Sequence, residues 1–221
     1  IGEARKPGQT RLDMLGRSVE MLKELLEQLK PYKIPGIVVT ITNPADIVAD
    51  YVRKGLGLER NRVFGTGTLL DTASLIRTLS EESGVGRRSI QAYSLGEHGD
   101  SSMIPFSSVT IGGLPFDAYD ISKEKVLEAT RQIGMTIIEG KKSTEFGIGR
   151  ALTEMAACIL RDEKKIMPAS VLLQGEYGQH DVHCGVPCLI GKNGIEKIIE
   201  LPLTEEEQAM LHKSCEVIKK P

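Results

Sequence analysis

The stretch Ile37-Val38-Val39-Thr40-Ile41-Thr42-Asn43-Pro44 decides the fold class. Its β-branched residues form a continuous run, which is typical of a strand buried on both faces of a parallel sheet. Asn43-Pro44 then predicts a turn at the carboxyl end of that strand. Ligands of open α/β sheets bind at such ends, so Asn43 is a candidate ligand-binding residue. A turn residue that begins the next helix would equally explain Asn43.

Helices and strands alternate on both sides of this run. An amphipathic pattern predicts a helix over residues 9–30, which Pro31 ends. A strand at 37–42, a helix near 45–55 and a strand near 62–64 follow. This order predicts βα units that form a parallel sheet.

The pattern changes after residues 65–68, where we expect the boundary between two lobes. A helix should run from Asp71 to about residue 83, with Gly84 as its stop, and Gly112-Gly113 predicts a hairpin. The second lobe is predicted to be α+β, with antiparallel strands. Its other expected elements are strands at 90–95, 103–111, 114–116, 168–174, 186–191 and 194–200, and helices at 122–139, 147–162 and 204–219, the last capped by Thr204.

Bulk composition excludes several classes of partner. The chain has 221 residues, a formal net charge of −2 and 40% hydrophobic residues, which is ordinary for a soluble globular protein. Nothing in this balance favours a nucleic-acid partner or a membrane partner. The stretch 180–188 holds histidines and cysteines, but its spacing fits no standard zinc pattern, so we predict no metal site. Four cysteines without a disulfide framework favour the cytoplasm.

A histidine and an aspartate are the strongest candidates for chemistry. His98 lies in Gly96-Glu97-His98-Gly99-Asp100, and Asp71 ends the segment GTGTLLD at residues 65–71. A carboxylate on the first turn of a helix could orient an imidazole in a glycine turn, and such a pair moves protons near neutral pH. A surface histidine in an ordinary turn remains the alternative.

One further element precedes the helix at 9–30. Residues 6–11 form a Pro/Gly loop that ends in Arg11. Arg11, the Asn43-Pro44 turn, Asp71 and His98 follow one another along the chain. In this order the sequence resembles the L-lactate/L-malate dehydrogenase family over nearly all of its length. The form of the His98 turn resembles the lactate enzymes more than the malate enzymes.

The resemblance implies roles for individual residues. His98 would exchange a proton with the substrate carbonyl, and Asp71 would orient His98. Arg11 would polarise the carbonyl from a loop that closes over the substrate. Asn43 would position the reacting groups, and Thr66 would contact the cofactor.

The resemblance also implies NAD as the cofactor, a small 2-oxo or 2-hydroxy acid as the substrate, and a homo-oligomer, either a dimer or a tetramer. Thr144 and Ile148 would line the substrate and nicotinamide pockets, although packing at a helix start would also explain them. Residues 1–66 would be the C-terminal half of a Rossmann parallel sheet, and residues 67–221 an α+β catalytic domain.

Two departures from the family pattern weaken this expectation. No glycine-rich dinucleotide fingerprint follows a strand, and the sequence begins at Ile1, so we expect an upstream βαβ portion to be missing. Ser74 stands where the family has an arginine that binds the substrate carboxylate, and a serine cannot supply two charged donors.

Alternatives to a lactate-type enzyme therefore stay open. Arg5 occupies the position at which malate enzymes carry a second arginine, so a malate dehydrogenase is one alternative, although a solvated loop cation would also explain Arg5. A truncated, catalytically impaired module that binds a ligand or forms oligomers is another.

Overall fold

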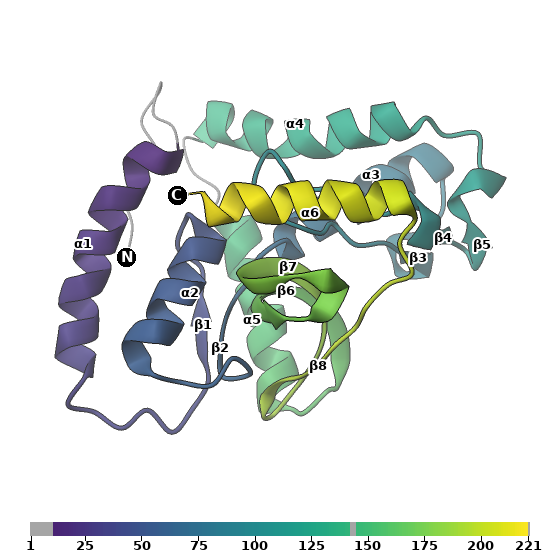
Figure 1. The fold of residues 1–221 in the computed structure, drawn as a ribbon. Coiled ribbons are helices and arrows are strands. Elements are labelled where there is room, and N and C mark those ends of the chain that lie inside the picture. The colour runs from purple at the N-terminus through teal and green to yellow at the C-terminus, as the bar shows by residue number, and fades with distance from the viewer. Residues whose placement is uncertain (1–10, 142–144, 221) are drawn as a thin grey trace.

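The computed structural model describes residues 11–141 and 145–220; residues 1–10, 142–144 and 221 lie outside the described residues. Helices alternate with short strands in the N-terminal part, and the long strands lie with further helices in the C-terminal part (Figure 1). The α-helices described are α1 (Arg11–Leu29), α2 (Ala45–Leu56), α3 (Leu69–Ser83), α4 (Lys123–Lys141), α5 (Phe146–Leu160) and α6 (Glu205–Lys219). The strands described are β1 (Val38–Thr40), β2 (Val63–Gly65), β3 (Ile90–Gln91), β4 (Thr110–Ile111), β5 (Leu114–Pro115), β6 (Lys165–Gln174), β7 (His180–Gly191) and β8 (Gly194–Ile198).

The main sheet has five strands in the order β1-β2-β6-β7-β8. Strands β1 and β2 are parallel, whereas β6, β7 and β8 are antiparallel. A single antiparallel pair, Gly65 with Ser170, connects the two parts. A smaller antiparallel sheet has the order β3-β4-β5. These findings confirm the predicted α/β class, with a parallel unit followed by antiparallel strands. Strands from both sides of the expected boundary at 65–68 share one sheet.

Three apolar clusters hold these elements together. One lies between α5, α6 and the β6–β7 hairpin, and Met155, Leu173 and Leu211 are fully buried in it. A second joins α3 to the small sheet through Leu75 and Ile111. A third joins α1 and α2 to β2. Figure 1 shows α6 running across β6 and β7, with α5 behind the same strands. No described helix is both long and apolar enough to cross a membrane.

Local capping signals correctly predicted two helix ends. Gly84 follows α3 with a φ of 71°, a left-handed conformation that glycine adopts without strain. Thr204 begins α6 in a capping box: its side chain accepts from the Glu207 backbone N–H, and the Glu207 side chain accepts from the Thr204 backbone N–H.

Several element boundaries differ from the sequence prediction. The expected strand at 90–95 is reduced to β3, because Gly96 bends the chain with a φ of 97° and only Leu95 forms a bridge, with Met103. The expected strand at 103–111 contains a 3₁₀ turn after Pro105 and pairs only as β4. Helix α3 begins two residues before Asp71, and the β6–β7 hairpin is longer than expected, since its polar residues also pair.

Candidate active site

The turn that carries His98 is hydrogen-bonded to strand β7 of the main sheet. The Gly96 N–H donates to Gly185 O over 2.9 Å, and the Gly185 N–H donates to Gly96 O over the same distance. A Cβ at Gly185 would lie 2.7 Å from Thr68 Oγ1 and 2.9 Å from Gly96 O, which is closer than real Cβ contacts. Gly185 therefore allows strand β7 to approach both the His98 turn and the start of α3.

We expect Gly185→Ala to lower stability, because the added methyl group must push apart two backbone segments. The expected cost is about 1–3 kcal/mol, or roughly 2–10 °C in Tm. Gly36→Ala is the matched control, since nothing lies within 4 Å of a Cβ at Gly36. Thermal unfolding of both variants checks this prediction, and equal Tm values would contradict it.

Asp71 holds the ring of His98. It lies in the first turn of α3, and His98 Nδ1 is 2.7 Å from Asp71 Oδ2. Because an ionised carboxylate only accepts hydrogen bonds, Nδ1 carries the proton in this pair. The His98 and Asp71 side chains are 23% and 31% exposed, so a small molecule can reach them. The contact expected from the sequence is therefore present.

Hydrogen bonds of buried hydroxyl groups connect α3 to the segment that precedes the His98 turn. The Thr68 hydroxyl donates to Ser94 O, and the Ser94 N–H donates to Thr72 Oγ1 over 2.9 Å. All three residues are buried. Both threonines lie in the segment around Asp71, but sequence reasoning missed them, because their partner is more than twenty residues away.

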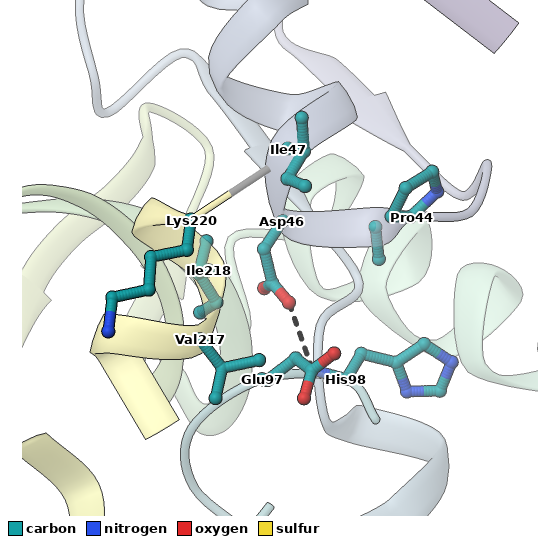
Figure 2. Close-up of a pocket in the computed structure, with 9 residues that line it drawn as sticks. Pro44, Asp46, Ile47, Glu97, His98, Val217, Ile218 and Lys220 are labelled. Atoms are coloured by element: carbon teal, nitrogen blue, oxygen red, sulfur yellow. Dashed lines mark hydrogen bonds between the residues drawn. The ribbon is translucent and has the colours of Figure 1, made fainter. Parts of the chain in front are cut away.

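Asp46 is a second carboxylate at the turn, and sequence reasoning missed it as well. Its Oδ2 accepts from the His98 backbone N–H over 2.9 Å (Figure 2). Its Oδ1 accepts from the Ser170 hydroxyl over 2.6 Å. Asp46 is 3% exposed. Burial raises the pKa of its carboxyl group to about 6, although the hydrogen bonds from Ser170 and His98 act in the opposite direction.

The other predicted site residues lie at different depths around this turn. Asn43 is exposed after β1, and Thr66 is buried after β2, where its N–H donates to Thr40 O over 3.1 Å. Ser74 is half-buried one helical turn after Asp71, and Ile148 on α5 packs against the main core.

The side chains of three predicted site residues are not among those that the structure describes. Arg5 and Thr144 lie outside the described residues, and so does the side chain of Arg11, whose backbone begins α1. Within the part of the chain that the structure describes, no group of three or more His, Cys, Asp or Glu side chains could hold a metal ion.

The carboxyl ends of β1 and β2 offer groups for one end of a dinucleotide. Thr40 Oγ1 is buried and has no hydrogen-bond partner among the described residues; it lies beside Gly65, where a Cβ would come within 3.1 Å of it. Asn43 presents an amide and Ile148 an apolar surface, which fit a carboxamide and a planar ring. The chain has no glycine fingerprint for the pyrophosphate. The residues present therefore fit the nicotinamide end only.

Comparison with protein families gives two matches, which together cover almost the whole chain. The NAD binding domain of lactate/malate dehydrogenase matches residues 1–65, and the alpha/beta C-terminal domain of the same family matches residues 68–221. The chain belongs to the lactate/malate dehydrogenase family. The family expected from the order of Arg11, Asn43, Asp71 and His98 is thereby confirmed.

Individual members of the lactate/malate dehydrogenase family match along almost the whole chain. L-lactate dehydrogenase 3 of Bacillus cereus is 41% identical over 227 residues, which cover 99% of this chain and 72% of the relative. The solved malate dehydrogenase of Aeropyrum pernix has a TM-score of 0.93 at 38% identity and covers 100% of this chain, which spans 72% of it. The lactate dehydrogenase of Cryptosporidium parvum, solved with lactic acid and β-nicotinamide adenine dinucleotide, has a TM-score of 0.93 at 30% identity, with coverage of 99% and 72%.

Proposed function

We propose that this protein transfers a hydride between NAD and a small L-2-hydroxy acid, either lactate or a branched analogue. The observation that carries the proposal is the 2.7 Å contact between His98 Nδ1 and Asp71 Oδ2, in a chain of the lactate/malate dehydrogenase family. Reduction of a 2-oxo acid places negative charge on the carbonyl oxygen, so it needs a proton donor beside that atom. An imidazole whose far nitrogen is held by a carboxylate meets this need.

His98, Asp71 and Arg11 have separate roles in the proposed reaction. His98 gives the proton on Nε2 to the substrate oxygen and takes it back in the reverse reaction. Asp71 keeps the ring oriented and stabilises the imidazolium form. Arg11 polarises the carbonyl and helps to exclude water, which strengthens each charge interaction.

Three residues would hold the nicotinamide end of the cofactor: Asn43, Thr66 and Ile148. When bound, NADH supplies the hydride. On the substrate side, Ser74 and Thr144 would contact the substrate. Since Ser74 is a single neutral donor, we expect weak binding of the substrate carboxylate.

Malate dehydrogenase activity is the second candidate. The similarity to the malate dehydrogenase of Aeropyrum pernix favours it, and Arg5 would bind the distal carboxylate. A candidate of another class is a catalytically impaired module that binds a ligand or forms oligomers, which Ser74 and the lack of a glycine fingerprint favour.

Oxidation of NADH with three 2-oxo acids separates these candidates. We expect turnover with pyruvate or 2-oxoisocaproate to exceed turnover with oxaloacetate, because the form of the His98 turn and Thr144 favour a monocarboxylate. A preference for oxaloacetate would instead assign a malate enzyme. Turnover of none of the three, in protein that unfolds cooperatively, would reject the proposed reaction and favour the impaired module.

The wider context of the proposed enzyme follows from the chain and its family. We propose a cytoplasmic homo-oligomer, a dimer or a tetramer, with no nucleic-acid or membrane partner; the four buried free cysteines suit a reducing compartment. We also propose that residues 1–66 form a partial dinucleotide-binding domain and that residues 67–221 form the α+β catalytic domain. Sedimentation of the purified protein tests the oligomeric state.

A further inference from the structure

Asp46 contacts the main chain of His98 (Figure 2), whereas Asp71 contacts its ring. We propose that Asp46 is a positioning residue of the site: it fixes the backbone of the His98 turn, and its negative charge favours the protonated imidazole. This inference rests on the proposed function, since it concerns the proton that His98 gives to the substrate.

Asp46 connects three segments that lie far apart in the sequence. It lies in the first turn of α2, it accepts from Ser170 on β6, and it accepts from His98 in the turn. With 3% of its surface exposed, water cannot replace either donor. Movement of the turn would therefore break a buried, charge-assisted hydrogen bond.

Several charged and titratable groups face Asp46 from the elements around it. Glu97 and His98 face it from the turn, Cys184 faces it from β7, and Lys220 lines the same small cavity at the end of α6. Among the described residues, no lysine or arginine forms an ion pair with Asp46. An imidazolium at His98 is a positive charge that the Asp46 carboxylate stabilises.

Asp46 is a charged acceptor, although a neutral side chain could make the same hydrogen bonds. An asparagine could accept from the His98 N–H through its oxygen and donate to Ser170 through its nitrogen. Burial raises the pKa of Asp46 from 3.8 to about 6. Because this pKa is higher in the folded state, the contribution of Asp46 to stability is greatest below pH 3.8. It is lost as the pH rises through about 6. The carboxylate therefore lowers stability at neutral pH, while its two hydrogen bonds hold α2, β6 and the His98 turn together.

Histidine titration followed by NMR tests the charge without requiring turnover. The chain has four histidines, so carbon-13 labelling of histidine gives few signals, and His98→Asn assigns the one at the turn. In Asp46→Asn we expect the midpoint of the His98 titration to fall by about one pH unit. Asp50→Asn is the matched control one helical turn along α2, because Asp50 contacts Lys54 and His183 instead. It should leave the His98 midpoint in place.

Kinetics and thermal unfolding complete the test. In thermal unfolding, Asp46→Asn should raise Tm at pH 8 and remove the loss of stability between pH 4 and 7. In kinetics, the same variant should lower kcat for 2-oxo acid reduction about tenfold, while KM changes little. Asp46→Ala should lower kcat further, since the His98 N–H then has no acceptor. An unmoved His98 midpoint in Asp46→Asn would overturn the inference. A moved midpoint in a protein without any dehydrogenase turnover would leave the positioning role intact and reject the proposed reaction alone.

Discussion

Replacement of His98 by asparagine is expected to lower kcat for reduction of a 2-oxo acid by about 10²–10⁴-fold, because the proton donor is lost. Asparagine is the informative choice, because its amide nitrogen can still donate to Asp71 Oδ2. In the unaltered protein that oxygen lies 2.7 Å from His98 Nδ1. KM should change much less than kcat, because the proton moves only as the transition state forms. Initial rates of NADH oxidation at saturating pyruvate measure the effect.

His180→Asn is the matched control for this result. His180 is exposed at the start of β7, away from the His98 turn, so its replacement should leave kcat and Tm unchanged. An enzyme that keeps most of its activity in His98→Asn would show that another group, or water, protonates the substrate.

Replacement of Ser74 by arginine is expected to raise kcat/KM by at least about 30-fold, since a charged contact to a carboxylate in a desolvated site contributes roughly 2 kcal/mol or more. Ser74 lies three residues after Asp71 on α3, on the same face of the helix, and is half-buried. A guanidinium there could bind the substrate carboxylate through two parallel hydrogen bonds. Most of the gain should appear as a lower KM.

Ala73→Arg separates this effect from the simple addition of charge. Ala73 is exposed on the same helix but points about 100° away from Ser74, so an arginine there should leave kcat/KM nearly unchanged. If Ser74→Arg folds with an unaltered Tm and gains nothing, then another group of this chain already binds the carboxylate.

The sequence predicted the elements whose signals are local. The run of β-branched residues before Asn43 predicted a parallel strand, and β1 and β2 pair in that way. The expected burial on both faces was wrong, because β1 has only three residues, lies at the edge of the sheet and is partly exposed. Gly84 and Thr204 mark helix ends through backbone conformation and capping, which need no distant partner. The contact between Asp71 and His98 was predictable because each lies in a distinctive glycine-rich segment.

What the sequence could not predict depends on distant packing. Asp46 follows a proline at a helix start, where an acidic residue favours the helix dipole and is usually solvated. Its burial follows only when β6 places Ser170, 124 residues away, against it. His183 is a polar residue with 1% exposure, within 3.3 Å of Asp50, and the antiparallel pairing of β6 and β7 decides that position.

A double-mutant cycle on His98 and Asp71 tests the central claim most directly, because that claim makes the two side chains one proton-transferring unit. His98→Asn and Asp71→Asn should each lower kcat strongly, and the double variant should be no slower than His98→Asn alone. Losses that instead multiply in the double variant would mean that Asp71 acts elsewhere, and would contradict the account.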